Sequence, residues 1–292
     1  MRILTVCAFL PLLVCGLCPG YGNTTPGQNS AIPDIMPEMG ATVTIVNQFF
    51  VPEAYYIGGL SIAEVSGLDH IGFPSYPDKK LYYYTLDGDL EIGVSLIYSG
   101  NIYPWDFCYS PDTTRIFIDD FISPNIFYTT DFSNWDSYPN PAGTDGKGLE
   151  WTDDISAATL ILEAKYSGFE SGVYMFTELN EVSVYYEVSY PNNYLTGVTV
   201  FPFNGNYYLM LMSSEMDYFY FYTSTVPLTL VGYVEFPADF DGHYDIAYCY
   251  SRDSVYMSGE DNGQFCVYEL HFDFYNVGIQ SKSLGCVKAL YH

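Results

Sequence analysis

A polar turn followed by a short apolar strand recurs along this chain, and this recurrence constrains the fold more than any other feature. The clearest copies begin at Asp78, Asp112, Asn204 and Asp253, and a weaker copy begins at Ala158. Measured from these positions, the spacings are 34, 46, 46 and 49 residues. A period in the forties with about four strands per unit is typical of a β-propeller blade.

The segments between these turns have the composition of strands. Tyr, Phe, Val, Ile and Thr gather in short runs bounded by Asp, Gly, Asn and Pro, as in 81–85, 115–118 and 217–223, and no long stretch has helical periodicity with caps. We predict an all-β chain that forms a β-propeller of five blades, each with four antiparallel strands. A strand at Thr42–Val51 would close the ring by joining the last blade. The alternative is a β-sandwich, which explains the regular period less well.

The N-terminus has the pattern of a secretory signal. Arg2 precedes an apolar stretch that runs from Ile3 to Cys18 and is broken only by Pro11, with small residues before Asn23. The stretch is too short for a comfortable membrane span, and no later run is long enough. We expect a secreted, extracellular protein without a membrane span. The expected parts are a signal peptide at 1–22, a disordered Pro/Gly/Ser/Thr-rich leader at 23–41 and a single propeller domain at 42–292.

Two covalent modifications are predicted for an oxidising compartment. Asn23-Thr24-Thr25 is a glycosylation sequon at the start of the leader. Four cysteines remain after the signal, and we predict a disulfide between Cys266 and Cys286, which would sit on neighbouring strands. In the alternative reading, Cys108 and Cys249 are buried free thiols.

The charge balance excludes one large class of partner. The chain has 9 Lys and Arg against 35 Asp and Glu, a formal net charge of −26. Nucleic acid is therefore a poor partner, whereas divalent cations and cationic surfaces would be attracted. Adaptation to a salty medium is the alternative explanation. Two turns rich in carboxylates suit Ca²⁺, although such turns are also common structural features. Their candidate metal ligands are Asp87, Asp89, Asp239 and Asp241.

Superimposing the repeat units predicts that acids gather at one end of the innermost strands. Asp69, Asp106, Glu150 and Asp245 fall at this position in four units, whereas the fourth unit has Gly197. Converging carboxylates acquire raised pKa values or bind a cation; alternatively, each pairs with backbone N–H groups at a strand end. We take Asp245, together with Trp105 and Trp151 beside the other acids, as candidate ligand-binding residues.

Two short motifs resemble secreted five-bladed glycosidases of the arabinanase and invertase group. The segment 129–135 is similar to their Ser-x-Asp-Leu-x-x-Trp turn, and 203–209 resembles their Asn-Gly-x-Tyr-Tyr strand. The resemblance implies a propeller in which Asp69 is the base or nucleophile, Asp106 a supporting acid and Glu150 the general acid. The chain departs from the family where His70 replaces a Pro and where Trp105-Asp106-Phe107 replaces Arg-Asp-Pro. The resemblance therefore supports the fold more than the activity.

Two classes of function follow. The first is a non-catalytic, secreted, acidic propeller that binds Ca²⁺, an extracellular glycan or a matrix protein. A variant of this class is a protein of a mineralised extracellular matrix, whose partner would be calcium mineral. The second is a glycoside hydrolase that acts on an extracellular polysaccharide through Asp69, Asp106 and Glu150.

Overall fold

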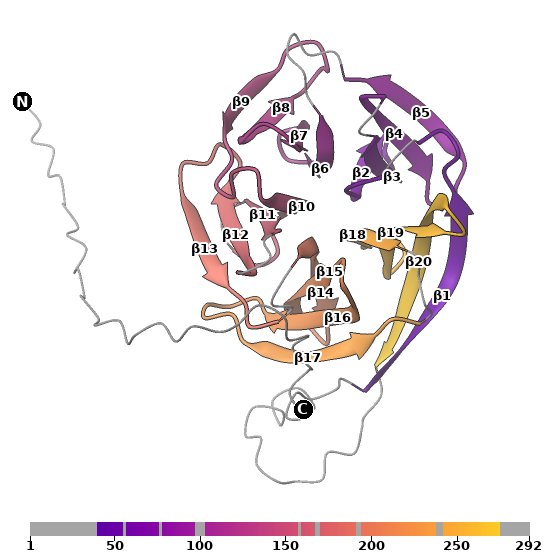
Figure 1. The fold of residues 1–292 in the computed structure, drawn as a ribbon, viewed down its shortest axis with the longest axis vertical. Coiled ribbons are helices and arrows are strands. Elements are labelled where there is room, and N and C mark those ends of the chain that lie inside the picture. The colour runs from indigo at the N-terminus through magenta and orange to yellow at the C-terminus, as the bar shows by residue number, and fades with distance from the viewer. Residues whose placement is uncertain are drawn as a thin grey trace, which may run out of the picture. The chain divides into compact units, whose positions relative to one another are not determined.

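The chain folds as the predicted five-bladed propeller. The computed structural model describes residues 40–54, 57–75, 78–96, 103–156, 159–166, 170–190, 194–237 and 242–274, all within the compact unit Met36–His292. These residues form five antiparallel sheets of four strands each. The sheets are arranged as blades around a common axis (Figure 1).

Each blade runs from an innermost strand beside the axis to an outermost strand at the rim. The innermost strands are β2 (Ser61–Val65), β6 (Pro104–Ser110), β10 (Gly146–Thr152), β14 (Leu195–Phe203) and β18 (Gly242–Cys249). The second strands are β3 (Leu68–Ser75), β7 (Arg115–Asp120), β11 (Leu160–Lys165), β15 (Asn206–Ser213) and β19 (Ser254–Asp261). The third strands are β4 (Lys80–Thr85), β8 (Asn125–Thr129), β12 (Gly172–Thr177), β16 (Met216–Thr223) and β20 (Gln264–Phe274). The outermost strands are β5 (Leu90–Ser95), β9 (Asp136–Pro139), β13 (Ser183–Glu187), β17 (Leu230–Glu235) and β1 (Ala41–Phe50).

The ring is closed by β1, as the sequence predicts. This strand pairs antiparallel with β20, from Ala41 opposite Phe274 to Phe50 opposite Cys266. The first described strand of the chain therefore forms the rim of the last blade (Figure 1). Pairing of two segments that are far apart in the sequence therefore closes the ring within the last blade.

The first repeat unit begins earlier in the chain than the sequence pattern predicts. The turn at Asp78 joins the second and third strands of its blade, β3 and β4, whereas the turns at 112, 204 and 253 join an innermost strand to a second strand. The equivalent turn in the first blade is Ser66-Gly67, with φ of 54° and 80°. Measured from position 66, the first spacing becomes 46 residues, equal to the two that follow. Asp69 consequently lies on β3 and not on the innermost strand.

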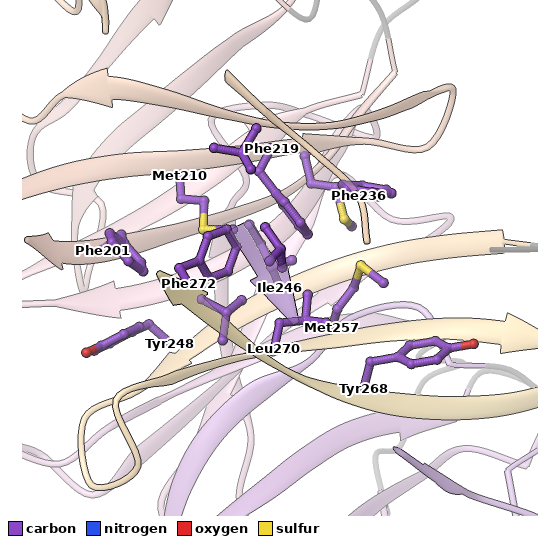
Figure 2. Packing of buried hydrophobic residues seen from close by; sticks show 14 of the residues in the cluster. Phe201, Met210, Phe219, Phe236, Ile246, Tyr248, Met257, Tyr268, Leu270 and Phe272 are labelled. Carbon is purple, nitrogen blue, oxygen red and sulfur yellow. The ribbon is translucent and has the colours of Figure 1, made fainter. Parts of the chain in front are cut away.

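The core consists mainly of aromatic and aliphatic side chains packed between neighbouring blades. In the cluster between the fourth and fifth blades, the ring of Phe272 lies 5.5 Å from that of Phe201 and 5.3 Å from that of Phe219, measured between centroids (Figure 2). Phe219 also packs on Phe236 at 4.3 Å. Edge-to-face and tilted contacts of this kind explain much of the aromatic content of the chain.

Several sequence predictions fall outside the described residues. These are the signal peptide, almost all of the leader, the sequon at Asn23, the metal candidates Asp239 and Asp241, and Cys286. The other three cysteines of the expected mature chain, Cys108, Cys249 and Cys266, are buried free thiols, so the pairing of Cys266 with Cys286 stays a prediction. Within the described ranges, no helix has the length and apolar character needed to cross a bilayer.

Candidate functional site

Two buried acids occupy equivalent positions on innermost strands of different blades. The strands β6, β10, β14 and β18 each contain a β-bulge, and the residue after the bulge is Asp106, Leu149, Gly197 or Asp245. Asp106 and Asp245 are 0% and 1% exposed, and each carboxyl group shifts the pKa of the other. The predicted convergence of acids on the axis is therefore found for this pair.

The two axial acids also hold neighbouring blades together. Asp106 accepts hydrogen bonds from the backbone N–H groups of Phe107, at 2.6 Å, and of Leu149 in the next blade. Asp245 accepts from the N–H of Leu60 in the first blade, at 2.7 Å. Gly59 is required beside this pair, because an added Cβ would lie 1.5 Å from Oδ1 of Asp106. Both readings of the sequence thus apply, since the acids converge and also pair with backbone N–H groups.

Burial governs the protonation of this pair. Desolvation raises the pKa of Asp106 well above its usual range, and the nearby Asp119 carboxylate raises the pKa further, against the hydrogen bonds from Leu149 and Phe107. Desolvation likewise raises the pKa of Asp245, and the Asp106 carboxylate is the next cause. Two buried carboxyl groups whose charges repel each other are most stable when they hold one proton between them. The axis therefore retains a proton at pH values where exposed acids have lost theirs.

A second buried cluster lies beside the axis, between the second and third blades. Asn140 donates hydrogen bonds to Asp119 at 3.3 Å and to Glu163 at 2.6 Å, and Nζ of Lys147 lies 4.0 Å from Asp119. Desolvation raises the pKa of Asp119 to about 7 despite Lys147, and it raises the pKa of Glu163 as well. Trp105 belongs to this cluster, because Nζ of Lys147 lies 4.5 Å from the centroid of its ring.

A pocket of about 400 Å³ opens at the end of the propeller where β6, β10 and β18 finish. Five acids line it: Glu64, Asp69, Glu150, Asp153 and Asp154. Four aromatic residues line it as well: Tyr109, Trp151, Tyr248 and Tyr250. Of the residues predicted for the site, the pocket brings together Asp69, Glu150 and Trp151, whereas Asp106, Asp245 and Trp105 do not line it.

The acids of the pocket lack cationic partners. No Lys, Arg or His lines the pocket, and none of the ion pairs among the described residues includes one of its five acids. Among the pocket acids, Glu150 interacts electrostatically with both axial acids. Burial and then the charge of Asp106 raise the pKa of Glu150 well above its usual range, and its Oε2 atom is buried without a hydrogen-bond partner.

The pocket acids are arranged as two walls and not as a cage for a metal ion. Glu64 and Asp69 face each other across β2 and β3 of the first blade. Glu150, Asp153 and Asp154 come from β10 and the turn after it in the third blade. Within the described ranges, no three His, Cys, Asp or Glu side chains are close enough together to hold a metal ion.

Glu178 fixes the aromatic side of the pocket. Its carboxylate accepts a hydrogen bond from Nε1 of Trp151 at 3.0 Å. It also accepts from Ser110, from Thr113 at 3.1 Å and from Arg115 at 3.3 Å, all in the second blade. Trp151 is therefore held in one orientation by a buried network that bridges two blades.

We predict that Glu178→Ala releases Trp151. The indole N–H and the Ser110 hydroxyl lose a charged acceptor, which costs about 2 kcal/mol of unfolding free energy, and Trp151 emission shifts to longer wavelength as the ring becomes mobile. Urea unfolding and tryptophan fluorescence measure the two effects. Glu178→Gln keeps an acceptor oxygen and serves as the matched control. Unchanged emission in Glu178→Ala would show that packing alone orients the ring.

The remaining predicted residues have other surroundings. Asp87 is exposed and forms an ion pair with Arg252 at 2.7 Å, and Asp89 is exposed in the same turn. In the segment that carries the glycosidase resemblance, Asp131 accepts hydrogen bonds from the N–H groups of Ser133 and Asn134, both at 2.8 Å. These bonds hold the pKa of Asp131 down to about 2. The motif is thus a structural turn between β8 and β9.

Sequence reasoning missed most of the pocket. No sequence pattern points to Glu64, Asp153, Asp154 or the three tyrosines, because they lie near or after strand ends in different blades. One signal was present: Asp153-Asp154 follows Trp151 directly. Glu64 lies on an innermost strand only when the first turn of the repeat is placed at Ser66.

Comparison with known proteins supports the fold alone. No family model matches the chain, and no curated protein matches its sequence. Among solved structures, glutaminyl cyclase from Myxococcus xanthus is similar with a TM-score of 0.60 and 12% identity, over 82% of this chain and 100% of the other. A chain of a nidogen/laminin complex has a TM-score of 0.53 and 10% identity, over 74% and 84%. A member of the duf4221 family from Bacteroides vulgatus has 0.50 and 8%, over 82% and 100%. These neighbours indicate a propeller and do not single out the arabinanase and invertase group.

Proposed function

We propose that this chain is a ligand-binding propeller whose pocket receives an organic cation between carboxylates and aromatic rings. The observation that carries the proposal is the lining itself: five acids and four aromatic rings around about 400 Å³, with no cation among the lining residues. A positively charged group gains attraction from the acids and from the faces of aromatic rings. An anionic ligand would be repelled.

The proposal keeps the expected extracellular location and the binding role, for which the N-terminal sequence and the charge of −26 give support. It narrows the ligand from Ca²⁺, glycan or matrix protein to a cationic organic molecule. Ca²⁺ binding by Asp239 and Asp241, which lie outside the described residues, stays a separate prediction. So does binding to calcium mineral.

Three aromatic probes of matched size and different charge test this function. Phenethylamine, phenylethanol and phenylacetate are titrated into the full chain at physiological salt, and Trp151 fluorescence is followed. We expect phenethylamine to bind at least about tenfold more tightly than phenylethanol, and phenylacetate not to bind. Trp151→Phe removes the signal, whereas Trp135→Phe, outside the pocket, retains it. Equal affinities for the charged and neutral probes would contradict the proposal.

Glycoside hydrolysis is the second candidate function, and Glu150 is the observation that favours it. Its raised pKa and its place in a pocket with Asp69 suit a general acid that lies in the same pocket as a second carboxyl group. Asp106 does not suit a catalytic role, because it is fully buried and bonded to backbone N–H groups. We expect no sugar release from a polysaccharide panel. Release that is lost in Glu150→Gln would instead favour the enzyme. Peptides that begin with glutamine belong in the same panel, read for ammonia, because one neighbour is a glutaminyl cyclase.

A further inference from the structure

The two acidic walls of the pocket stand on blades that are not adjacent. Glu64 and Asp69 belong to β2 and β3, whereas Glu150, Asp153 and Asp154 belong to β10 and the turn that follows it. In the ring, β2 and β10 lie on opposite sides of the axis (Figure 1). Between the walls the lining is less polar, with Tyr109 from the second blade, Val200 from the fourth and Tyr248 from the fifth. The pocket thus has two negative regions separated by an aromatic and aliphatic stretch.

The first wall places two like charges opposite each other. Glu64 and Asp69 are direct partners in the antiparallel register of β2 and β3, and like charges directly opposite each other destabilise a sheet. Neither acid has an ion-pair partner among the described residues. A bound cation would relieve this repulsion. A sheet under selection for stability alone would gain from replacing either acid, so the pair is better explained by a ligand.

The acids of the second wall also lack ion-pair partners among the described residues, but hydrogen bonds hold the position of their turn. Asp154 accepts a hydrogen bond from the Tyr250 hydroxyl of the fifth blade and another from Tyr207 of the fourth. The turn after β10 is therefore tied at the pocket to two other blades. Asp153, beside it in the same turn, has no ion-pair partner in the described part of the chain.

We propose that the ligand is an alkyl diamine or polyamine, with one ammonium group at each acidic wall and its methylene chain along the aromatic and aliphatic lining. This inference rests on the proposed function, because it assumes that the pocket binds organic cations. Two ammonium groups on one chain engage the walls together, so the second contact is intramolecular and raises the affinity. A methylene chain suits the less polar stretch, where a compact ion would leave one wall unpaired.

Matched pairs of amines test this inference on the full chain. Putrescine and cadaverine are compared with butylamine and pentylamine by calorimetry at physiological salt. We expect each diamine to bind at least about tenfold more tightly than the monoamine of equal length. In Glu64→Gln/Asp69→Asn, and equally in Asp153→Asn/Asp154→Asn, the advantage of the diamine should fall to about twofold, the statistical factor for two equivalent ends. Monoamine binding should persist at the wall left intact.

The first double variant also reports on folding. Because it removes like charges that face each other, Glu64→Gln/Asp69→Asn should have an unchanged or raised melting temperature, so loss of diamine binding cannot be ascribed to unfolding. Glu181→Gln/Glu187→Gln changes the charge equally at exposed positions of the third blade, at β13 and the turn before it, and should retain the full diamine advantage.

The outcomes separate this inference from the proposed function. Equal affinity for diamines and monoamines would overturn the inference and leave cation binding intact. The same holds if the Glu181→Gln/Glu187→Gln control loses the diamine advantage, because the charge would then act as a diffuse field. Absence of binding by every amine would overturn both.

Discussion

The protein should lose stability as the pH rises from 5 to 8. Five acids have pKa values raised by burial: Asp106, Asp119, Glu150, Glu163 and Asp245. In the unfolded chain the same groups lose their protons near pH 4. Between the two pKa values the folded state binds more protons than the unfolded state, so the free energy of unfolding falls with rising pH. His243 opposes this trend, because burial lowers its pKa.

The size of the slope follows from linkage. Each acid that is protonated when folded and ionised when unfolded contributes a loss of about 1.4 kcal/mol per pH unit. For Asp119 the window extends from about 4 to about 7. For Asp106 and Asp245 the pH window also begins at about 4, and it extends up to their raised pKa values. We expect a total loss of about 3 kcal/mol or more between pH 5 and 8, which is large against ordinary domain stabilities.

Urea unfolding at several pH values and constant salt measures this slope. Exposed acids have completed their titration by pH 5, so the slope above that pH reports buried groups. Asp106→Asn/Asp245→Asn removes two of them and should flatten the curve, whereas Asp136→Asn at an exposed site of β9 should leave it unchanged. Stability that is constant or rising between pH 5 and 8 would mean that the acids are ionised in the folded protein.

The sequence predicted the architecture because the repeat is carried by local features. Turns such as Asn204-Gly205 place two residues at positive φ, and this chemistry is visible in the sequence. The start of the first blade was misplaced for the same reason. Lys79 and Ser66 have the same φ of 54°, so the sequence offered two turns of similar kind, and only the pairing of β2 with β3 distinguishes them.

The site was less predictable, because it depends on single-residue register. Asp106 and Asp245 follow equivalent bulges and meet at the axis, but Glu150 lies one residue beyond Leu149, which holds the equivalent place in β10. A shift of one residue turns a side chain to the other face of a strand. Because of this shift Glu150 lines the pocket, whereas Asp106 and Asp245 are buried at the axis. The same repeat therefore predicted the cluster of acids but not their separate roles.

Loss of the axial Asp106 carboxyl should be among the most damaging single changes. In Asp106→Ala the N–H groups of Leu149 and Phe107 lose their acceptor in a fully buried place. An unsatisfied buried donor costs about 1–3 kcal/mol, so we expect Asp106→Ala to lower the free energy of unfolding by about 3 kcal/mol at pH 5. The electrostatic interaction with Asp245 is lost as well.

The cost of this substitution should shrink as the pH rises, which separates electrostatics from packing. At pH 8 the proton held by Asp106 and Asp245 is being lost, so the two carboxylates repel each other in the wild-type protein. Removing one acid relieves this repulsion, although it still breaks the hydrogen bonds between blades. Asp106→Asn retains an acceptor oxygen for the N–H of Leu149 but leaves the N–H of Phe107 without one. It should cost about 1–2 kcal/mol at pH 5, less than Asp106→Ala, and its cost should likewise shrink at pH 8. Urea unfolding of both variants at both pH values measures these differences. A cost for Asp106→Ala that does not change with pH would show that Asp106 acts only as a backbone acceptor and that no proton is shared at the axis.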